Sequence, residues 1–203
     1  MLYYYQQGGG FMHPILVLLI LGIMISIERL ITLSRASVNT RKFLSKVKEA
    51  LSSGGVDSAI EVCENTRGPV ASIFHAGLLR SDRGVEAAEK AISNAGSIEM
   101  AFLERGMIWL ATIIAVAPML GFTGTVVGMI QAFDAIAAAN NISPAIVAGG
   151  ISVALLTTCF GLIVAIITQI LHNFFISRID KLIIDMEESS TELVDALVAL
   201  DKK

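Results

Sequence analysis

Residues 106–177 read GMIWLATIIAVAPMLGFTGTVVGMIQAFDAIAAANNISPAIVAGGISVALLTTCFGLIVAIITQILHNFFIS, and Asp134 is the only charged residue among them. A helix needs about 20 mostly apolar residues to cross the hydrocarbon core of a membrane. The stretch is long enough for two crossings, and the turn-forming residues Asn140–Pro144 divide it. It therefore predicts an antiparallel pair of spans, 106–139 and 146–177, joined by a short loop at 140–145.

A third apolar run, residues 14–33, lies near the start of the chain. Its uncharged part, Pro14–Ile27, is short for a span, but leucine and isoleucine residues extend it past Glu28 and Arg29. A secretory signal peptide is the competing interpretation, and it has positive charge before the apolar run and a cleavage site after it. Residues 1–13 contain no Lys or Arg. We therefore predict a retained first span that follows a short N-terminal tail.

The composition agrees with a polytopic, all-α membrane protein. The chain of 203 residues is 54% hydrophobic and 16% charged, with a mean hydropathy of +0.71, whereas soluble domains carry about 25% charged residues. A net charge of −3 without a basic run gives no indication of nucleic-acid binding.

The positive residues near the ends of the spans predict the orientation, since Lys and Arg stay on the cytoplasmic side. They flank the cytoplasmic end of the first span, precede the second and follow the third: Arg29, Arg35, Arg41, Arg105, Arg178 and Lys181. The tail 1–13 and the loop 140–145 have none. The prediction is a multi-pass membrane protein with the N-terminus and the loop 140–145 outside, a cytoplasmic region at 34–105 and a cytoplasmic C-terminus at 178–203.

The cytoplasmic region has a helical pattern. Apolar residues at helical spacing predict helices over 41–51, 56–65 and 70–80, with Gly54–Gly55 and Gly68–Pro69 as breaks.

The pattern that starts at Val85 continues to Arg105, so we expect one unbroken helix from there into the second span. The third span is expected to continue as a helix over 178–203. Apolar stripes outside the membrane must be buried, and we expect them to pack against each other and against copies of the same chain.

Residues that could carry chemistry are few. Cys63 and Cys159 belong to different predicted regions, and the three histidines have no metal-ligand spacing. His172 near the end of the third span is interpreted as an interfacial polar residue rather than a proton relay. We predict no catalytic residue, no metal and no cofactor, and hence not an enzyme.

Small residues recur every three or four positions along the second and third spans. The two stripes are Ala111, Ala115, Pro118, Gly121, Thr125, Gly128, Ala132 and Ala135, and Gly150, Ala154, Thr158, Gly161, Ala165, Thr168 and His172. Such stripes let helices approach closely in lipid, and packing alone is one explanation of them. The alternative is that threonines on the small faces of adjacent helices line a polar seam.

Four segments resemble the ExbB/TolQ/MotA proton-channel family: Leu103–Gly106, Val116–Gly121, Gly124–Gly128 and Leu155–Leu162. The resemblance covers residues 25–171, and the three-span topology is similar to the ExbB/TolQ branch.

This resemblance implies a homo-pentamer with a central pore around the single span of an ExbD/TolR-like partner that carries a membrane Asp. It implies that the chain lies in the bacterial inner membrane with a periplasmic N-terminus, and that Thr125 and Thr158 line the ion pathway. Asp134, Thr157 and His172 are the candidates for accessory polar residues. The small residues that we predict to serve helix packing are Pro118, Gly121, Gly124, Gly128 and Gly161. The implied function is use of the proton motive force to energise outer-membrane transport or envelope processes through a TonB-like periplasmic protein.

One position departs from the family pattern. Many relatives carry Glu five residues before the second-block threonine, whereas this chain has Val153. Asp134 could partly replace that carboxylate, although an interfacial acid is the favoured interpretation. A Na⁺-driven motor, and a scaffold or channel without motor activity, remain as alternatives.

Overall fold

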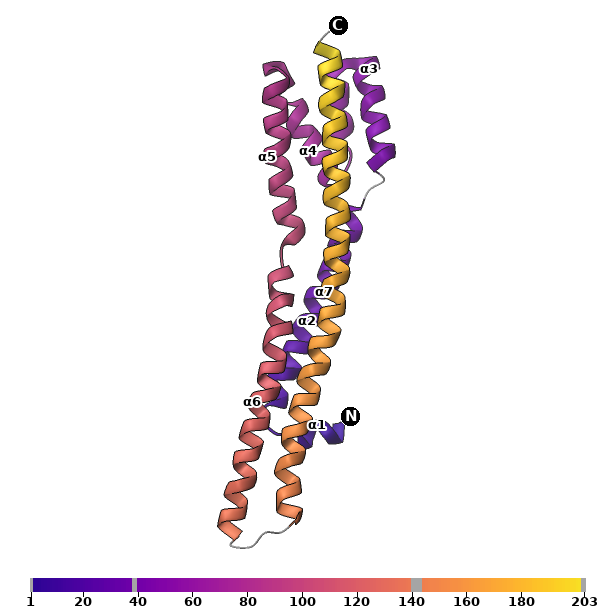
Figure 1. The fold of residues 1–203 in the computed structure, drawn as a ribbon. Helices are drawn as coiled ribbons and strands as arrows, with labels where there is room; N and C mark the ends of the chain where they lie inside the picture. The colour runs from indigo at the N-terminus through magenta and orange to yellow at the C-terminus, as the bar shows by residue number, and fades with distance from the viewer. Residues whose placement is uncertain (1, 38–39, 140–143, 202–203) are drawn as a thin grey trace. The chain divides into compact units, whose positions relative to one another are not determined.

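The computed structural model describes residues 2–37, 40–139 and 144–201, and all regular structure within them is helical (Figure 1). The elements are α1 (Leu2–Gln7), α2 (Met12–Ala36), α3 (Thr40–Glu64), α4 (Pro69–Leu78), the short 3₁₀ helix η1 (Ser81–Arg83), α5 (Val85–Glu104), α6 (Met107–Ala139) and α7 (Pro144–Asp201).

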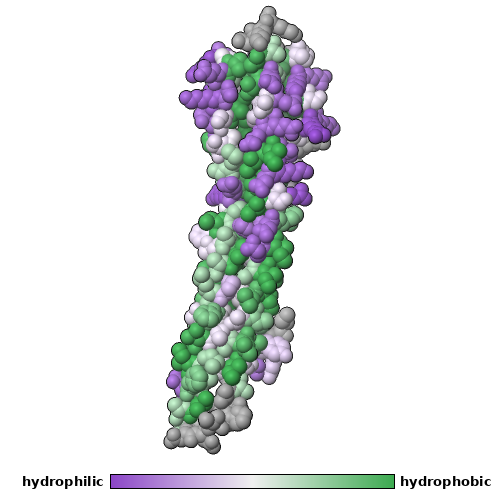
Figure 2. Space-filling model, viewed as in Figure 1, coloured by the Kyte–Doolittle hydropathy of each residue, from purple (hydrophilic) through white to green (hydrophobic). Residues whose placement is uncertain are grey.

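The chain divides into two compact units. Unit 1 comprises Met1–Arg29 and Gly106–Phe174, and unit 2 comprises Leu30–Arg105 and Phe175–Lys203. The charged residues follow the same division, because unit 1 contains only Glu28, Arg29 and Asp134. Figure 2 shows hydrophobic side chains over the α6 and α7 segments of unit 1 and hydrophilic ones over unit 2.

Three helical stretches are long and apolar enough to cross a membrane, within the residues that the structure describes. They lie in α2, in α6 and in the first part of α7, as the sequence predicts. The α6 helix has 33 residues, which corresponds to about 50 Å at 1.5 Å per residue and exceeds the span requirement. The turn residues 140–143 lie outside the described residues, and α7 begins at Pro144.

In unit 1, α2 packs against α6 and α7. Ile15 of α2 joins Ile113 and Ala117 of α6 and Val164 of α7 in one buried cluster. Many large apolar side chains of α2 remain exposed: Leu16, Val17, Ile20, Leu21, Ile23, Met24 and Ile27. An exposed apolar surface of this size is typical of a site that contacts a membrane or another protein. For a membrane span, the lipid provides that contact.

The expected unbroken helix from Val85 into the second span is wrong. The α5 helix ends at Glu104, Arg105 has φ −54° and ψ 130°, and α6 starts at Met107 after Gly106 with φ +87°. Glycine adopts positive φ without the steric penalty of a Cβ atom. Gly106 therefore permits a break that the helical periodicity on both sides of it conceals.

The expected continuation of the third span is confirmed. The α7 helix runs through 58 residues from Pro144 to Asp201. In unit 2 its predicted apolar stripe is buried at Phe175, Ile179, Leu182, Met186, Leu193 and Leu197.

The short helices of unit 2 also follow the sequence. The α3 helix is interrupted at Gly55, which has φ +75°, and α4 begins with Pro69 directly after Gly68. Phe43 of α3 packs on the fully buried Phe74 of α4, with ring centroids 5.5 Å apart. Lys48 of α3 and Glu192 of α7 form an exposed ion pair, which contributes little to stability.

Cys63 lies in the core of unit 2, and burial raises the pKa of its thiol from 9.0 to about 11. The thiolate is the reactive form, so a two-unit increase lowers the thiolate fraction at pH 8 about a hundredfold. We expect iodoacetamide to alkylate Cys63 at least about a hundredfold more slowly in the folded protein than in urea. Peptide mass spectrometry of a Cys159→Ser variant measures both rates, and equal rates would contradict the buried position.

The same shift couples the stability of the fold to pH. The folded state holds the thiol proton more tightly than the unfolded state. The protonated thiol of Cys63 therefore contributes to the free energy of unfolding. This contribution is fully present below pH 9 and is lost as the pH rises toward 11.

Candidate functional site: the seam between α6 and α7

The two helices of the apolar hairpin meet through backbone and small side chains. A Cβ atom on Gly161 of α7 would lie 2.6 Å from the Ala117 carbonyl oxygen and 3.2 Å from the Gly121 Cα atom. One on Gly150 would lie 2.9 Å from the Gly128 carbonyl oxygen. Such distances are shorter than van der Waals contact, so only glycine fits. Small residues on facing helices permit this close approach in lipid.

Thr125 of α6 and Thr158 of α7 are hydrogen-bonded to each other across this seam. The Thr158 hydroxyl also lies 3.1 Å from the Gly121 carbonyl oxygen of the opposite helix, to which it can donate. The Thr125 hydroxyl lies 3.1 Å from the Ala154 carbonyl oxygen, again across the seam. Both side chains are half-buried. The structure thus brings together the two threonines that the resemblance singles out.

The two hydroxyls have one proton each: one proton forms the bond between the threonines, and the other is donated to a backbone carbonyl, that of Gly121 or that of Ala154. Gly121 and Ala154 lie inside helices, where their carbonyl oxygens also accept the backbone N–H groups four residues on. A carbonyl oxygen has two lone pairs, so it keeps one partner when a threonine hydroxyl rotates away. The pair can therefore turn a proton toward another acceptor without leaving a buried carbonyl unsatisfied.

Thr157 has a different environment from its neighbour. It is fully buried, and a Cβ atom on Gly124 would lie 2.6 Å from its Oγ1 atom. Its hydroxyl donates to the Ala154 carbonyl oxygen at 2.9 Å, within its own helix. The structure places Thr157 in the packing of the seam, with its hydroxyl satisfied locally.

The other predicted packing residues lie along the same line on α6. Gly121 and Gly128 face α7, where Cβ atoms would lie 3.0 Å from the Thr158 Cα atom and 3.1 Å from the Ala154 nitrogen. Pro118 is half-buried inside α6. Proline has no N–H group, so the carbonyl of Ile114 lacks its usual helical partner.

Three further residues stand apart from the threonine pair. Asp134 is exposed on α6, as an interfacial acid would be. Val153 is next to the N-terminal segment: a Cβ atom on Gly9 would lie 3.6 Å from its Cγ1 atom. His172 is half-buried, and its Nδ1 atom has no hydrogen-bond partner within the described residues.

Sequence reasoning missed the acceptors of the threonine hydroxyls. Gly121 and Ala154 were recognised only as small residues, whereas their carbonyl oxygens accept hydrogen bonds from the opposite helix. The spacing of small residues shows where two helices approach closely, but side-chain types alone do not show which carbonyl lies opposite which hydroxyl.

Comparison with known proteins shows similarity over most of the chain. Residues 65–188 match the model of the MotA/TolQ/ExbB proton channel family. A protein of Methanothermobacter thermautotrophicus, named as a homologue of the biopolymer transport protein ExbB, is 36% identical over 177 residues, which are 87% of this chain and 63% of the relative. The "ExbB-like 3" protein of Synechocystis is 30% identical over 84% of this chain and 82% of that protein.

A Tol-Pal system protein TolQ of Pseudomonas aeruginosa is 36% identical over 56% of this chain and 54% of the relative. The match to the Methanothermobacter relative covers 63% of that protein, which is less than two thirds of its length. The family model matches more than half of the chain. The chain belongs to the MotA/TolQ/ExbB proton channel family, and it is a multi-pass membrane protein rather than an enzyme.

Proposed function

We propose that this chain is the multi-span subunit of an ion-driven motor of the ExbB–ExbD or TolQ–TolR type. Five copies surround the single span of a smaller partner, whose membrane Asp takes up and releases protons. The partner uses the proton motive force for outer-membrane transport or envelope processes, through a TonB-like protein where the system has one. In this proposal the subunit lies in the bacterial inner membrane, with the N-terminus periplasmic and the C-terminus cytoplasmic.

The pair of hydroxyls at Thr125 and Thr158 is the observation that carries the proposal. A charged carboxylate in lipid is costly unless it is hydrogen-bonded. The carbonyl oxygens of Gly121 and Ala154 keep their backbone hydrogen bonds when a threonine hydroxyl rotates away. The hydroxyls can therefore donate to an ionised Asp when it passes.

The charge distribution supports the same proposal. A partner Asp in the lumen would meet few competing charges, because Asp134 is the only charged residue of α6 and of the part of α7 that belongs to unit 1. Ion coupling would then rest on the partner carboxylate and on the threonine hydroxyls. Each charge that crosses the membrane releases about 2.3 kcal/mol per 100 mV, which is several times the thermal energy.

The test is co-expression with an ExbD/TolR-like protein encoded in the same genome, followed by native mass spectrometry and reconstitution into liposomes. We expect five copies of this chain and a proton flux that is lost when the partner Asp is replaced by Asn. A monomer or dimer, or a flux that is independent of the partner Asp, would contradict the motor. A flux that requires Na⁺ would indicate the Na⁺-driven alternative. No flux from an intact complex would favour a scaffold.

A further inference from the structure

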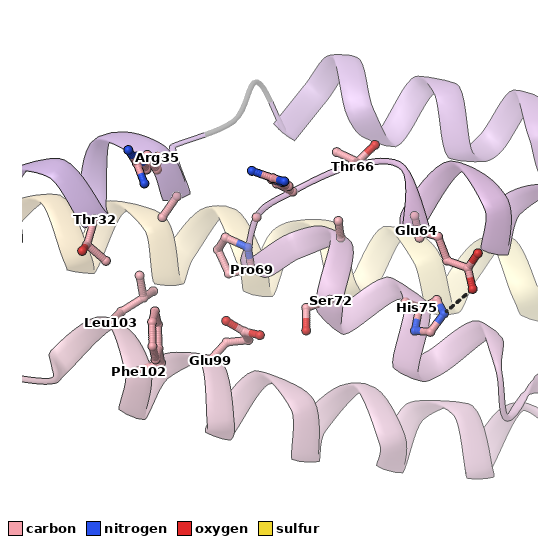
Figure 3. Close-up of a pocket in the computed structure, with 15 residues that line it drawn as sticks. Thr32, Arg35, Glu64, Thr66, Pro69, Ser72, His75, Glu99, Phe102 and Leu103 are labelled. Carbon is pink, nitrogen blue, oxygen red and sulfur yellow. Dashed lines mark hydrogen bonds and ion pairs between the residues drawn. The ribbon is translucent and has the colours of Figure 1, made fainter.

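Unit 2 contains an open pocket of about 610 Å³ that the motor does not use (Figure 3). Its walls are the end of α2 with Arg35, the turn before α4 with Arg67 and Pro69, and α5 with Glu99 and Phe102. A pocket of this volume is in the range of small-molecule sites. It lies entirely within one compact unit, so its shape does not depend on the position of unit 1.

Two arginines on this pocket are available to an anion. Arg35 and Arg67 line it, both are exposed, and neither forms an ion pair or hydrogen bond in the part of the chain that the structure describes. The first turn of α4 is in the same wall and has no side-chain cap on its N–H groups. Guanidinium groups and a free helix N-terminus are both donors for a phosphate group.

The pocket is also lined by a carboxylate that lies across it from Arg35. Glu99 extends from α5 into the pocket, on the side opposite Arg35 (Figure 3). The second carboxylate of the lining, Glu64, is paired with His75 at 3.4 Å. The pocket therefore offers two unpaired cations, Arg35 of α2 and Arg67 of the turn before α4, and the carboxylate of Glu99 on α5. This separation of charge complements a ligand that carries both a phosphate and an ammonium group.

The position along the chain places this pocket next to the membrane surface. Arg35 follows Leu33, the last apolar residue of the first span, by two residues of the continuous helix α2, about 3 Å along its axis. Phe102 on the opposite wall is 51% exposed although it is apolar. Phospholipid phosphates lie at this depth, just outside the hydrocarbon core, and the exposed ring offers apolar contact beside them.

We propose that this pocket binds the headgroup of a phospholipid that carries a primary amine. Arg35 and Arg67 donate hydrogen bonds to the phosphodiester, Glu99 accepts from the ammonium group, and Phe102 contacts the glycerol and first acyl carbons. The bound lipid fixes the end of α2 to α4 and α5 of unit 2. This inference requires only that the chain is membrane-embedded, and it is independent of the ion that drives the motor.

The test is native mass spectrometry of delipidated protein titrated with phosphatidylethanolamine, phosphatidylglycerol or phosphatidylcholine. We expect phosphatidylethanolamine to bind most tightly. The Arg35→Gln/Arg67→Gln variant should bind all three lipids at least about tenfold more weakly, because the phosphate contact is common to them. Glu99→Gln should remove the preference for phosphatidylethanolamine and leave phosphatidylglycerol binding unchanged.

Two controls make the result specific. Arg83→Gln removes an exposed arginine of η1 outside this pocket, and it should leave lipid binding unchanged. Free O-phosphoethanolamine should compete poorly, since it lacks the glycerol and acyl contacts. Equal lipid binding by the double arginine variant would overturn the site. Binding of O-phosphoethanolamine as tight as that of the lipid would show a soluble phosphate ligand and overturn the assignment to a lipid.

Discussion

Replacement of Gly161 by alanine should destabilise the hairpin of α6 and α7 by about 1–3 kcal/mol, as overpacking of a tight interior does. The added Cβ atom would lie 2.6 Å from the Ala117 carbonyl oxygen and 3.2 Å from the Gly121 Cα atom. Both are backbone atoms that cannot rotate away, so the helices must separate. Separation would also weaken the hydrogen bonds between Thr125 and Thr158. Thermal unfolding in detergent, followed by circular dichroism at 222 nm, measures the loss.

Gly149→Ala is the matched control. Gly149 lies in the same helix and is exposed, and a Cβ atom there would meet no atom within 4 Å. Alanine favours a helix over glycine by about 1 kcal/mol, so this variant should be as stable as the natural chain or slightly more stable. Equal melting temperatures for the Gly161→Ala and Gly149→Ala variants would contradict the close seam.

The sequence predicts the seam well because close helix packing in lipid leaves a periodic signature. Gly121 and Gly128 belong to the small-residue stripe of α6 and Gly161 to that of α7. A Cβ atom on Gly121 or Gly161 would collide with the opposite helix, and one on Gly128 would be in tight contact with it. The pattern does not show how far one helix is displaced along the other. The displacement determines which groups lie opposite each other: the Thr158 hydroxyl lies opposite the Gly121 carbonyl oxygen, and Thr157 packs on Gly124.

The break between α5 and α6 and the pocket of unit 2 were not predicted, for two physical reasons. A single glycine within a helical pattern is compatible with a helix, so Gly106 carried no distinct signal until its φ of +87° was known. The pocket joins Arg35, Arg67 and Glu99, which are far apart in the sequence and share no periodicity. Residues that are assembled by tertiary packing leave no local pattern.

Thr125→Val and Thr158→Val should each reduce ion flux through the complex with its partner about ten- to hundredfold. A hydrogen bond to a charged group is worth about 1.5–3 kcal/mol, and valine keeps the shape of threonine without the hydroxyl. Stability should change little, because side-chain hydrogen bonds between membrane helices contribute about 0.6 kcal/mol on average. Liposome flux and energised transport, at matched expression and pentamer yield, measure the effect.

Thr112→Val and Thr123→Val provide controls on the same helix. Both residues are exposed on α6, and their hydroxyls donate within the helix to Ile108 and Met119, each at 2.8 Å. We expect little change in flux for either variant. The double variant Thr125→Val/Thr158→Val tests the pair itself. Since the two hydroxyls are bonded to each other, the double variant should lose less than the product of the two single losses. If both single variants retain full flux with the pentamer intact, the two threonines only hold the helices together, and the ionised Asp must be stabilised elsewhere.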